Sequence, residues 1–385
     1  MIKRFRKCVL ITAALTLAAC SFSGCGKAID GTATVATLND EKIPMGVASL
    51  YARYQQAQMF SYYGQYLGDN IFSQVTDKDT GTTYGDTMKD NVMDTLEQMY
   101  LLKQHAGDYD VTITDEEKTS ITDAAKSFVD ANDAATLEKM GVSQSDVETL
   151  MELFVYQTKM RTELTADVDT NVTDDEAGQS KITYVEISLA GTEQDADGNT
   201  VDLTDEEKAA KQSQAQSIID QINATGDPAA ADIDAIAKGV DTNLKAANGT
   251  FTAKPAEDAE DDSNLDSALK EAVTALTDGQ VVDHVITSSD GTKLYVARMD
   301  AVFDQESTDS KKESIISDRE QTMYDDQLKT WEDDSDFSVK KGVWKKLEIN
   351  DTDVYQYKAE ATETPEATET EQTTEETAVT ETPAE

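Results

Sequence analysis

The sequence is short of the residues that build metal centres and disulfide frameworks. Its 385 residues contain 3 cysteines, all within the first 25 positions, and only 2 histidines. Structural zinc is held by about four Cys or His ligands, and a disulfide framework needs paired cysteines spread along the chain. The composition therefore excludes both, and we expect neither a metal nor a cofactor.

Positive charge is also scarce. Lys and Arg number 33 against 76 Asp and Glu, so the formal net charge is −43. Proteins that bind DNA or RNA meet the phosphates with clustered Lys and Arg. A chain this acidic would be repelled by those phosphates, and nucleic-acid binding is excluded.

The first residues have the pattern of an export signal. Four cations lie within residues 1–7, and an apolar run follows over residues 8–19. This run is shorter than the roughly 20 residues that a membrane-spanning helix needs. The sequence Leu-Ala-Ala-Cys at 17–20 resembles the lipobox of bacterial lipoproteins, which implies a lipidated Cys20; Cys25, preceded by Ser-Gly, is the alternative.

From this pattern we predict a signal peptide at 1–19, a lipidated cysteine with its linker at 20–34, and a place on the outer face of the cytoplasmic membrane. Two acyl chains would anchor the protein stably, whereas one would hold it only marginally. An ordinary secretory signal with incidental cysteines is the other interpretation.

Residues 35–170 have the periodicity of a mostly helical lobe. A small hairpin is expected at 35–43, and helices at 46–63 and 87–105, where apolar residues recur every three or four positions. Thr114 and Glu117 have the spacing of a capping box, which predicts that another helix begins there. Helical patterns then continue to about residue 164.

Residues 173–303 change to a mixed pattern. Strands are expected at 182–189, 281–287 and 293–299, helices at 204–223, 232–238 and 264–276, and a broken acidic region at 248–262. This order predicts an α+β domain with helices against a small antiparallel sheet.

The chain then returns to helix. A helix is expected at 307–333, with an apolar stripe that ends at Trp331, followed by strand-like residues at 343–347. Residues 351–385 are rich in Glu and Thr, and we predict a disordered acidic tail because such a segment buries too little apolar surface to offset its ordering.

Two phrases of this sequence resemble the extracytoplasmic foldase family of PrsA and SurA. Residues 35–43 are similar to that family's entry strand, and residues 101–117 to its helix exit. The resemblance implies an α+β protein in which residues 35–170 and 304–350 form a chaperone lobe around an inserted parvulin-like domain at 173–303. It also implies that the partners are unfolded or partly folded secreted polypeptides.

The resemblance places three residues where active parvulins carry two His and an intervening Cys or Asp. They are Glu186, Thr250 and Tyr295, and none is of the usual type. Leu265 and Leu269 fall where the family has its proline-pocket Met and Phe. We therefore expect peptidyl-prolyl isomerase activity to be weak or lost; an active isomerase with diverged residues is one alternative, and a non-chaperone envelope adaptor is another.

An aromatic segment offers a second kind of site. Residues 51–66 are rich in Tyr and Met, which suits either a packed core or an adaptable surface for unfolded chains. On the second interpretation, Tyr62, Tyr63 and Tyr66 contact the client. His105 lies near a helix end, where a structural role is expected, and the acidic run at 257–262 lacks the spacing of a calcium loop.

Overall fold

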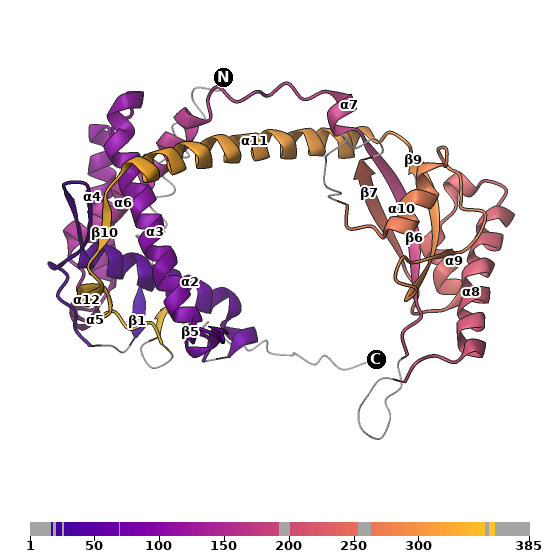
Figure 1. Ribbon diagram of the computed structural model, residues 1–385, viewed down its shortest axis with the longest axis horizontal. Coiled ribbons are helices and arrows are strands. Elements are labelled where there is room, and N and C mark those ends of the chain that lie inside the picture. The colour runs from indigo at the N-terminus through magenta and orange to yellow at the C-terminus, as the bar shows by residue number, and fades with distance from the viewer. Residues whose placement is uncertain are drawn as a thin grey trace, which may run out of the picture. The chain divides into compact units, whose positions relative to one another are not determined.

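Two compact units make up the chain (Figure 1). The computed structural model describes residue 17 and residues 21–24, 27–68, 70–191, 201–252, 263–350 and 354–358. The first unit combines Met1–Met160 with Trp331–Glu385, and the second is Arg161–Thr330. The predicted architecture, a helical lobe built from an early and a late segment with an α+β domain inserted between them, is confirmed.

The first unit is mostly helical. Its longer helices are α2 (Met45–Leu67), α3 (Tyr84–His105), α4 (Asp115–Ala131), α5 (Ala134–Met140) and α6 (Gln144–Leu164), which runs into the second unit. Its short pieces are β1 (Phe22–Gly24), β2 (Thr34–Leu38), β3 (Glu41–Pro44), η1 (Ile71–Ser73), β4 (Val75–Asp77), β5 (Thr82–Thr83), η2 (Ala106–Tyr109), β10 (Phe337–Val339), α12 (Lys341–Trp344) and β11 (Tyr355–Tyr357).

Local sequence determines where these helices begin. Thr114 and Glu117 form the predicted capping box, with the Thr114 N–H donating to Glu117 Oε2 at 2.8 Å. Thr83 and Asp86 form a second one at the start of α3. Each box satisfies backbone N–H groups that have no partner within the helix.

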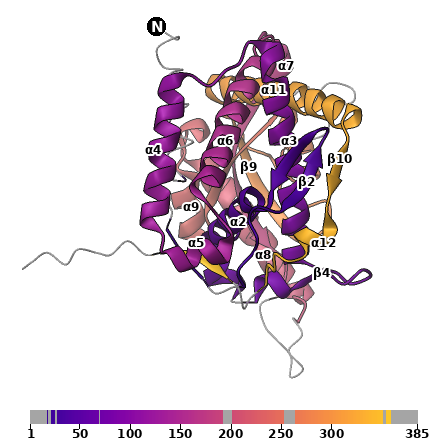
Figure 2. The same cartoon turned by 90° about the vertical axis from the view of Figure 1, so that its left-hand side faces the viewer.

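A three-stranded sheet joins the early and late parts of the first unit. Its order is β10-β2-β3, with Phe337 opposite Leu38 and Val339 opposite Ala36. Figure 2 shows β2 and β10 side by side. The Asn39 N–H also donates to the Asp336 carbonyl at 2.8 Å. Residues about 300 positions apart therefore share one small sheet.

The second unit contains a four-stranded antiparallel sheet, ordered β7-β6-β9-β8, with helices packed against it. Its strands are β6 (Gln179–Ser188), β7 (Ala246–Thr252), β8 (Ile286–Thr287) and β9 (Lys293–Ala301). Its helical elements are α7 (Asp174–Ala177), α8 (Asp205–Ala224), η3 (Pro228–Ala230), α9 (Ile233–Val240), α10 (Ser267–Thr274) and most of α11 (Gln305–Asp334). The core between α8, α9 and the sheet is aliphatic and includes Val185, Ile187, Ile218, Ile222 and Val296.

The second unit is longer at both ends than the predicted domain at 173–303. Side chains of α11 bond back to the start of the domain, where the Gln179 N–H donates to Thr308 Oγ1 at 3.1 Å and Lys312 pairs with Asp174. These contacts tie most of α11 to the second unit, and only its last turn, from Trp331, groups with the first.

Three strand predictions were wrong. Strand β7 begins before the region predicted as broken and acidic at 248–262 and runs into it, because its residues bond along β6. The strand predicted at 281–287 is reduced to β8 and one bridge at Val281. Residues 341–344 form the helical turn α12 in place of a strand, because the Trp344 N–H donates to the Lys340 carbonyl at 3.0 Å.

The predictions for the linker and the tail also need correction. Phe22–Gly24 pair with Tyr355–Tyr357 as the two-stranded sheet β1–β11, although 20–34 was predicted as linker and 351–385 as disordered tail. Tyr355 is buried, its N–H donates to Gln56 Oε1 at 3.2 Å, and the Arg53 guanidinium lies 4.3 Å from its ring. Cys20, Cys25 and residues 359–385 lie outside the described residues.

Helix α2 changes character along its length. Its first three turns carry the buried residues Met45, Val47 and Leu50, whereas its last turns expose their aromatic side chains. In the described ranges, no helix is long and apolar enough to span a membrane.

Candidate functional site

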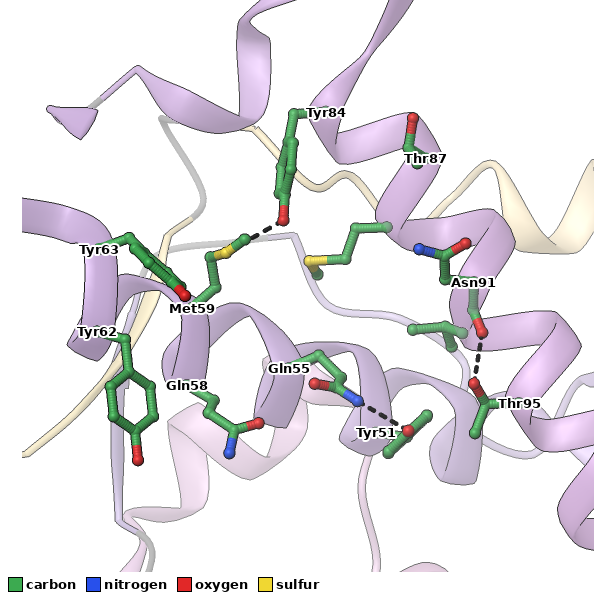
Figure 3. A pocket seen from close by; sticks show the side chains of 12 residues that line it. Tyr51, Gln55, Gln58, Met59, Tyr62, Tyr63, Tyr84, Thr87, Asn91 and Thr95 are labelled. Carbon is green, nitrogen blue, oxygen red and sulfur yellow. Dashed lines mark hydrogen bonds between the residues drawn. The ribbon is translucent and has the colours of Figure 1, made fainter. Parts of the chain in front are cut away.

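The exposed half of α2 and the first half of α3 border a groove of about 330 Å³. Figure 3 shows its lining side chains, which come from these two helices. Not one of them is charged, in a chain whose composition is 28% charged. The lining residues are Tyr51, Gln55, Gln58, Met59, Tyr62, Tyr63, Tyr84, Thr87, Met88, Asn91, Val92 and Thr95.

Hydrogen bonds inside the groove hold part of the lining in place. The Tyr84 hydroxyl donates to Met59 Sδ at 3.1 Å, which links α3 to α2 (Figure 3). Gln55 Nε2 donates to the Tyr51 hydroxyl at 2.7 Å. Burial raises the pKa of both the Tyr51 and the Tyr84 phenol, so both stay neutral at physiological pH.

The tyrosines predicted to contact clients are the exposed aromatics of α2. Tyr62, Tyr63 and Tyr66 expose 70%, 53% and 85% of their surface. Tyr62 and Tyr63 line the groove, with Tyr63 directed toward Met59, whereas Tyr66 lies outside the lining. By contrast, Tyr51 from the same segment is 5% exposed, so the segment serves both as core and as surface.

The α3 side of the groove was not predicted from the sequence. Tyr84 lies 25 positions beyond Met59, and Asn91 is polar, so neither stands out in a helical pattern. Met88 is 8% exposed and is one of the apolar residues that recur along the helix predicted at 87–105. One sequence feature could have revealed this side of the groove, namely the capping box at Thr83. It fixes the residue at which α3 begins and therefore which residues lie before the buried stripe of that helix.

The lining of the groove is suited to binding. It presents aromatic rings, thioethers and side-chain amides, which pack on apolar groups and bond to peptide groups. It has no carboxylate, imidazole, thiol or amine for acid–base or nucleophilic work.

The sheet of the second unit brings together only two of the three residues assigned to a parvulin constellation. Glu186 and Tyr295 are directly opposite each other on β6 and β9, and the Tyr295 hydroxyl donates to Glu186 Oε2 at 3.4 Å. Lys293 Nζ donates to the same oxygen at 3.0 Å. Burial and then the Glu186 charge raise the pKa of Tyr295 to about 12, so its hydroxyl stays protonated.

Thr250 does not join this pair. It is opposite Lys181, which lies five residues before Glu186 on β6. Thr250 is therefore about 16 Å from Glu186 along the strand direction. An odd separation also places it on the other face of the sheet. Its assignment to the same constellation is therefore wrong.

The two leucines assigned to the proline pocket belong to the domain interior. Leu269 is 1% exposed within the core, and Leu265 is partly buried against that core. A Cβ added at Gly249 would come 2.8 Å from Leu265 Cδ2 and 3.4 Å from Ile182, so Leu265 covers β7 at that position. Ile182 shares a face of β6 with Glu186, and the chain's own leucine occupies part of that face.

The other residues considered in the sequence analysis were His105 and the acidic run at 257–262. The His105 ring stacks on Trp331, and its Nδ1 lies 2.9 Å from Asp108 Oδ2. Among the described residues, no group of three or more His, Cys, Asp or Glu side chains is arranged to hold a metal ion. The acidic run at 257–262 lies outside the described residues.

Comparison with known protein families gives a match within the first unit. Residues 1–134 match the family model of the SurA-like N-terminal domain, which confirms the sequence resemblance for that segment. No curated protein matches the chain.

Several solved structures also match. One belongs to the work on PEB4 and Cj1289, two structurally related SurA-like chaperones of Campylobacter jejuni; it covers 80% of this chain and 99% of its own, at 12% identity and a TM-score of 0.27. The foldase protein PrsA from Streptococcus pneumoniae covers 71% of this chain and 97% of its own, at 14% identity and a TM-score of 0.27. Scores this low place no residue of this chain.

Proposed function

We propose that this protein, whose residues 1–134 match SurA-like N-terminal domains, is a membrane-anchored extracytoplasmic chaperone for unfolded or partly folded secreted polypeptides. One observation carries the proposal: the uncharged groove between α2 and α3, bordered by the exposed Tyr62 and Tyr63. A chaperone with many clients needs broad contacts of low specificity, and this groove provides them.

The lining residues suit an extended non-native segment. Such a segment exposes apolar side chains together with main-chain amides that have lost their partners. Tyr63 and Met59 offer adaptable apolar contact, and the amides of Gln58 and Asn91 offer donors and acceptors for the main chain. Because the lining carries no charge, it does not repel client segments of either positive or negative charge.

Suppression of client aggregation tests the proposal. The client is reduced α-lactalbumin, an acidic protein that a net charge of −43 does not attract non-specifically. Changing Tyr62, Tyr63 and Tyr66 to Ser should weaken suppression about fivefold or more, because the loss of even one aromatic contact costs about 1 kcal/mol, which is roughly fivefold in affinity. The matched control changes Val302 and Phe303, exposed apolar residues of the second unit, to Ser. Equal loss in both variants, or no loss in either, would refute the groove as the client site.

The anchoring part of the proposal draws on the export signal and on strand β1. Cleavage before Cys25 would remove Phe22–Gly24, which pair with β11. It would also remove the Phe22 ring, 5.9 Å from the Phe128 ring, and the Phe22 N–H, which donates to Asn132 Oδ1 at 2.7 Å. Cleavage before Cys20 keeps these contacts, which favours Cys20 as the lipidated residue at the outer face of the cytoplasmic membrane.

Isomerase activity is proposed to be weak or lost. Catalysis of prolyl rotation requires a pocket that binds the twisted amide better than the planar one. Here Glu186 is engaged by Lys293 and Tyr295, and Leu265 fills part of the same sheet face. These features leave the second unit as a folded scaffold.

A further inference from the structure

Four lysines are concentrated in seven residues of this acidic chain. Lys340, Lys341, Lys345 and Lys346 flank or belong to α12, and all four are exposed. The turn that carries them is packed against the first unit through Trp344 and Leu347, which are buried. Lys89 Nζ lies 5.3 Å from the Trp344 ring centroid. The lysines therefore lie on a fixed surface of the first unit.

No described carboxylate lies close to these lysines. None of the four lies within 4 Å of a carboxylate oxygen in the part of the chain that the structure describes, and Lys346 interacts with Asp30 only at longer range. Elsewhere in the first unit, Lys103 pairs with Glu41 at 2.6 Å and Lys159 with Glu117 at 2.6 Å. With acids outnumbering bases 76 to 33, four exposed lysines with no close carboxylate in the described ranges form a local cationic surface that suits an anionic partner.

The N-terminal segment places this cluster on the side of the proposed anchor. Lys27 Nζ lies 3.4 Å from Glu348 Oε1, so the chain that leaves β1 passes beside the segment that follows α12. The Lys358 N–H donates to the Ser21 carbonyl at 2.7 Å, and Ser21 is the residue after Cys20. An acyl chain at Cys20 would thus hold the first unit with this end toward the bilayer.

We propose that Lys340, Lys341, Lys345 and Lys346 bind the anionic phospholipid headgroups of the membrane that carries the anchor. This deepens the proposed function and rests on its anchoring part. A net charge of −43 would repel the protein from an anionic bilayer, and a local cationic face offsets that repulsion. An acyl anchor together with a polybasic patch is a pair of signals that gives stable attachment.

Vesicle cosedimentation tests the lysines apart from the acyl chain. The probe is the chain from residue 20 onward with Cys20→Ser and Cys25→Ser, mixed with vesicles of phosphatidylglycerol and phosphatidylcholine or of phosphatidylcholine alone. The test variant changes the four α12 lysines to Gln. The control changes four exposed lysines, Lys118, Lys126, Lys208 and Lys238, to Gln, so both variants gain the same negative charge.

The parent and the control should bind the phosphatidylglycerol vesicles. The test variant should bind them at least tenfold more weakly, because the attraction of each lysine to an anionic membrane surface strengthens binding roughly fivefold. Binding should disappear at about 0.5 M salt, where the Debye length is only a few ångströms. Equal binding by the test variant and the control would overturn the proposal. So would a parent that binds only after truncation at Lys358, because the acidic tail would then be the partner of these lysines. The aggregation assay contains no membrane, so this result stands apart from the chaperone test.

Discussion

The indole of Trp331 lies flat on the imidazole of His105, with ring centroids 4.2 Å apart and planes 5° apart. Tyr109 meets the same indole edge-on at 6.0 Å. Trp331 comes from the last turn of α11, whereas His105 and Tyr109 come from the end of α3 and from η2. This contact, with the β10–β2 pairing, joins the late segment to the early lobe.

Replacing Trp331 with Ala should strongly destabilise the first unit. Trp331 is 8% exposed, and truncating a buried Trp costs about 3–5 kcal/mol. Urea unfolding reports the change through the fluorescence of Trp344, the other of the chain's 2 tryptophans. Met323→Ala is the control on the same helix, because Met323 is 37% exposed and should change stability by less than about 1 kcal/mol. Equal unfolding midpoints for the two variants would contradict the role of the stack.

Stability of the first unit should fall between about pH 4.5 and pH 7 because of Glu97. Burial, followed by the charges of Glu332 and Asp94, raises the pKa of Glu97 to about 7 from 4.5. The native state therefore binds more protons than the unfolded state between these values, and ionisation above them destabilises the fold. Glu97→Gln should stabilise the protein by about 1 kcal/mol at pH 8, a figure reduced for solvent screening, and very little at pH 5.

Urea unfolding at the two pH values measures this difference. Glu138→Gln replaces an exposed glutamate of the same unit and should leave the pH dependence unchanged. A gain for Glu97→Gln that is as large at pH 5 as at pH 8 would mean that ionisation of this carboxyl is not the cause.

The sequence predicted what short-range chemistry determines. The capping box of Thr114 and Glu117 and the positions of the long helices follow from residues a few positions apart. The pairing of Phe337 with Leu38 does not, because nothing local shows which distant strand will complete a sheet edge. The strand at Tyr355–Tyr357 was also missed. Its acidic surroundings predict disorder, and only its distant contacts with Arg53 and Phe22 show that the segment is ordered and buried.

The groove illustrates the same division. The exposed tyrosines of α2 were identified from composition, but the α3 side depends on how two helices pack. The parvulin-like positions were mapped by order along the chain, and order alone could not give the register that places Thr250 opposite Lys181.

Prolyl isomerisation in a short peptide should be accelerated little or not at all by the intact protein. The reason is the occupied sheet face around Glu186, with Tyr295 protonated and Leu265 packed over Gly249. The measurement is the rate of cis-to-trans conversion, with an intact parvulin as the positive control. A rate near that of the control, abolished by Glu186→Gln and Tyr295→Phe together, would establish an active isomerase instead.

The mature chain should begin at Cys20 with an attached lipid. Strand β1 needs Phe22, whose ring also lies 5.7 Å from that of Tyr357. Mass spectrometry of the N-terminal peptide from the exported protein identifies the residue and its modification. An acylated Cys25 at the terminus would contradict the structural role of β1, and an unmodified terminus would contradict anchoring altogether.

The central claim is that clients bind between α2 and α3, and crosslinking from a single position tests it most directly. A photo-reactive phenylalanine analogue replaces Tyr63, which lines the groove, or Phe303, which is exposed to a similar degree in the second unit. The client is reduced α-lactalbumin, with folded α-lactalbumin as its control. Crosslinking at position 63 that is several-fold stronger than at 303, and that is lost with the folded client, is the predicted result. Equal yields at the two positions, or equal yields with folded and unfolded client, would contradict the account.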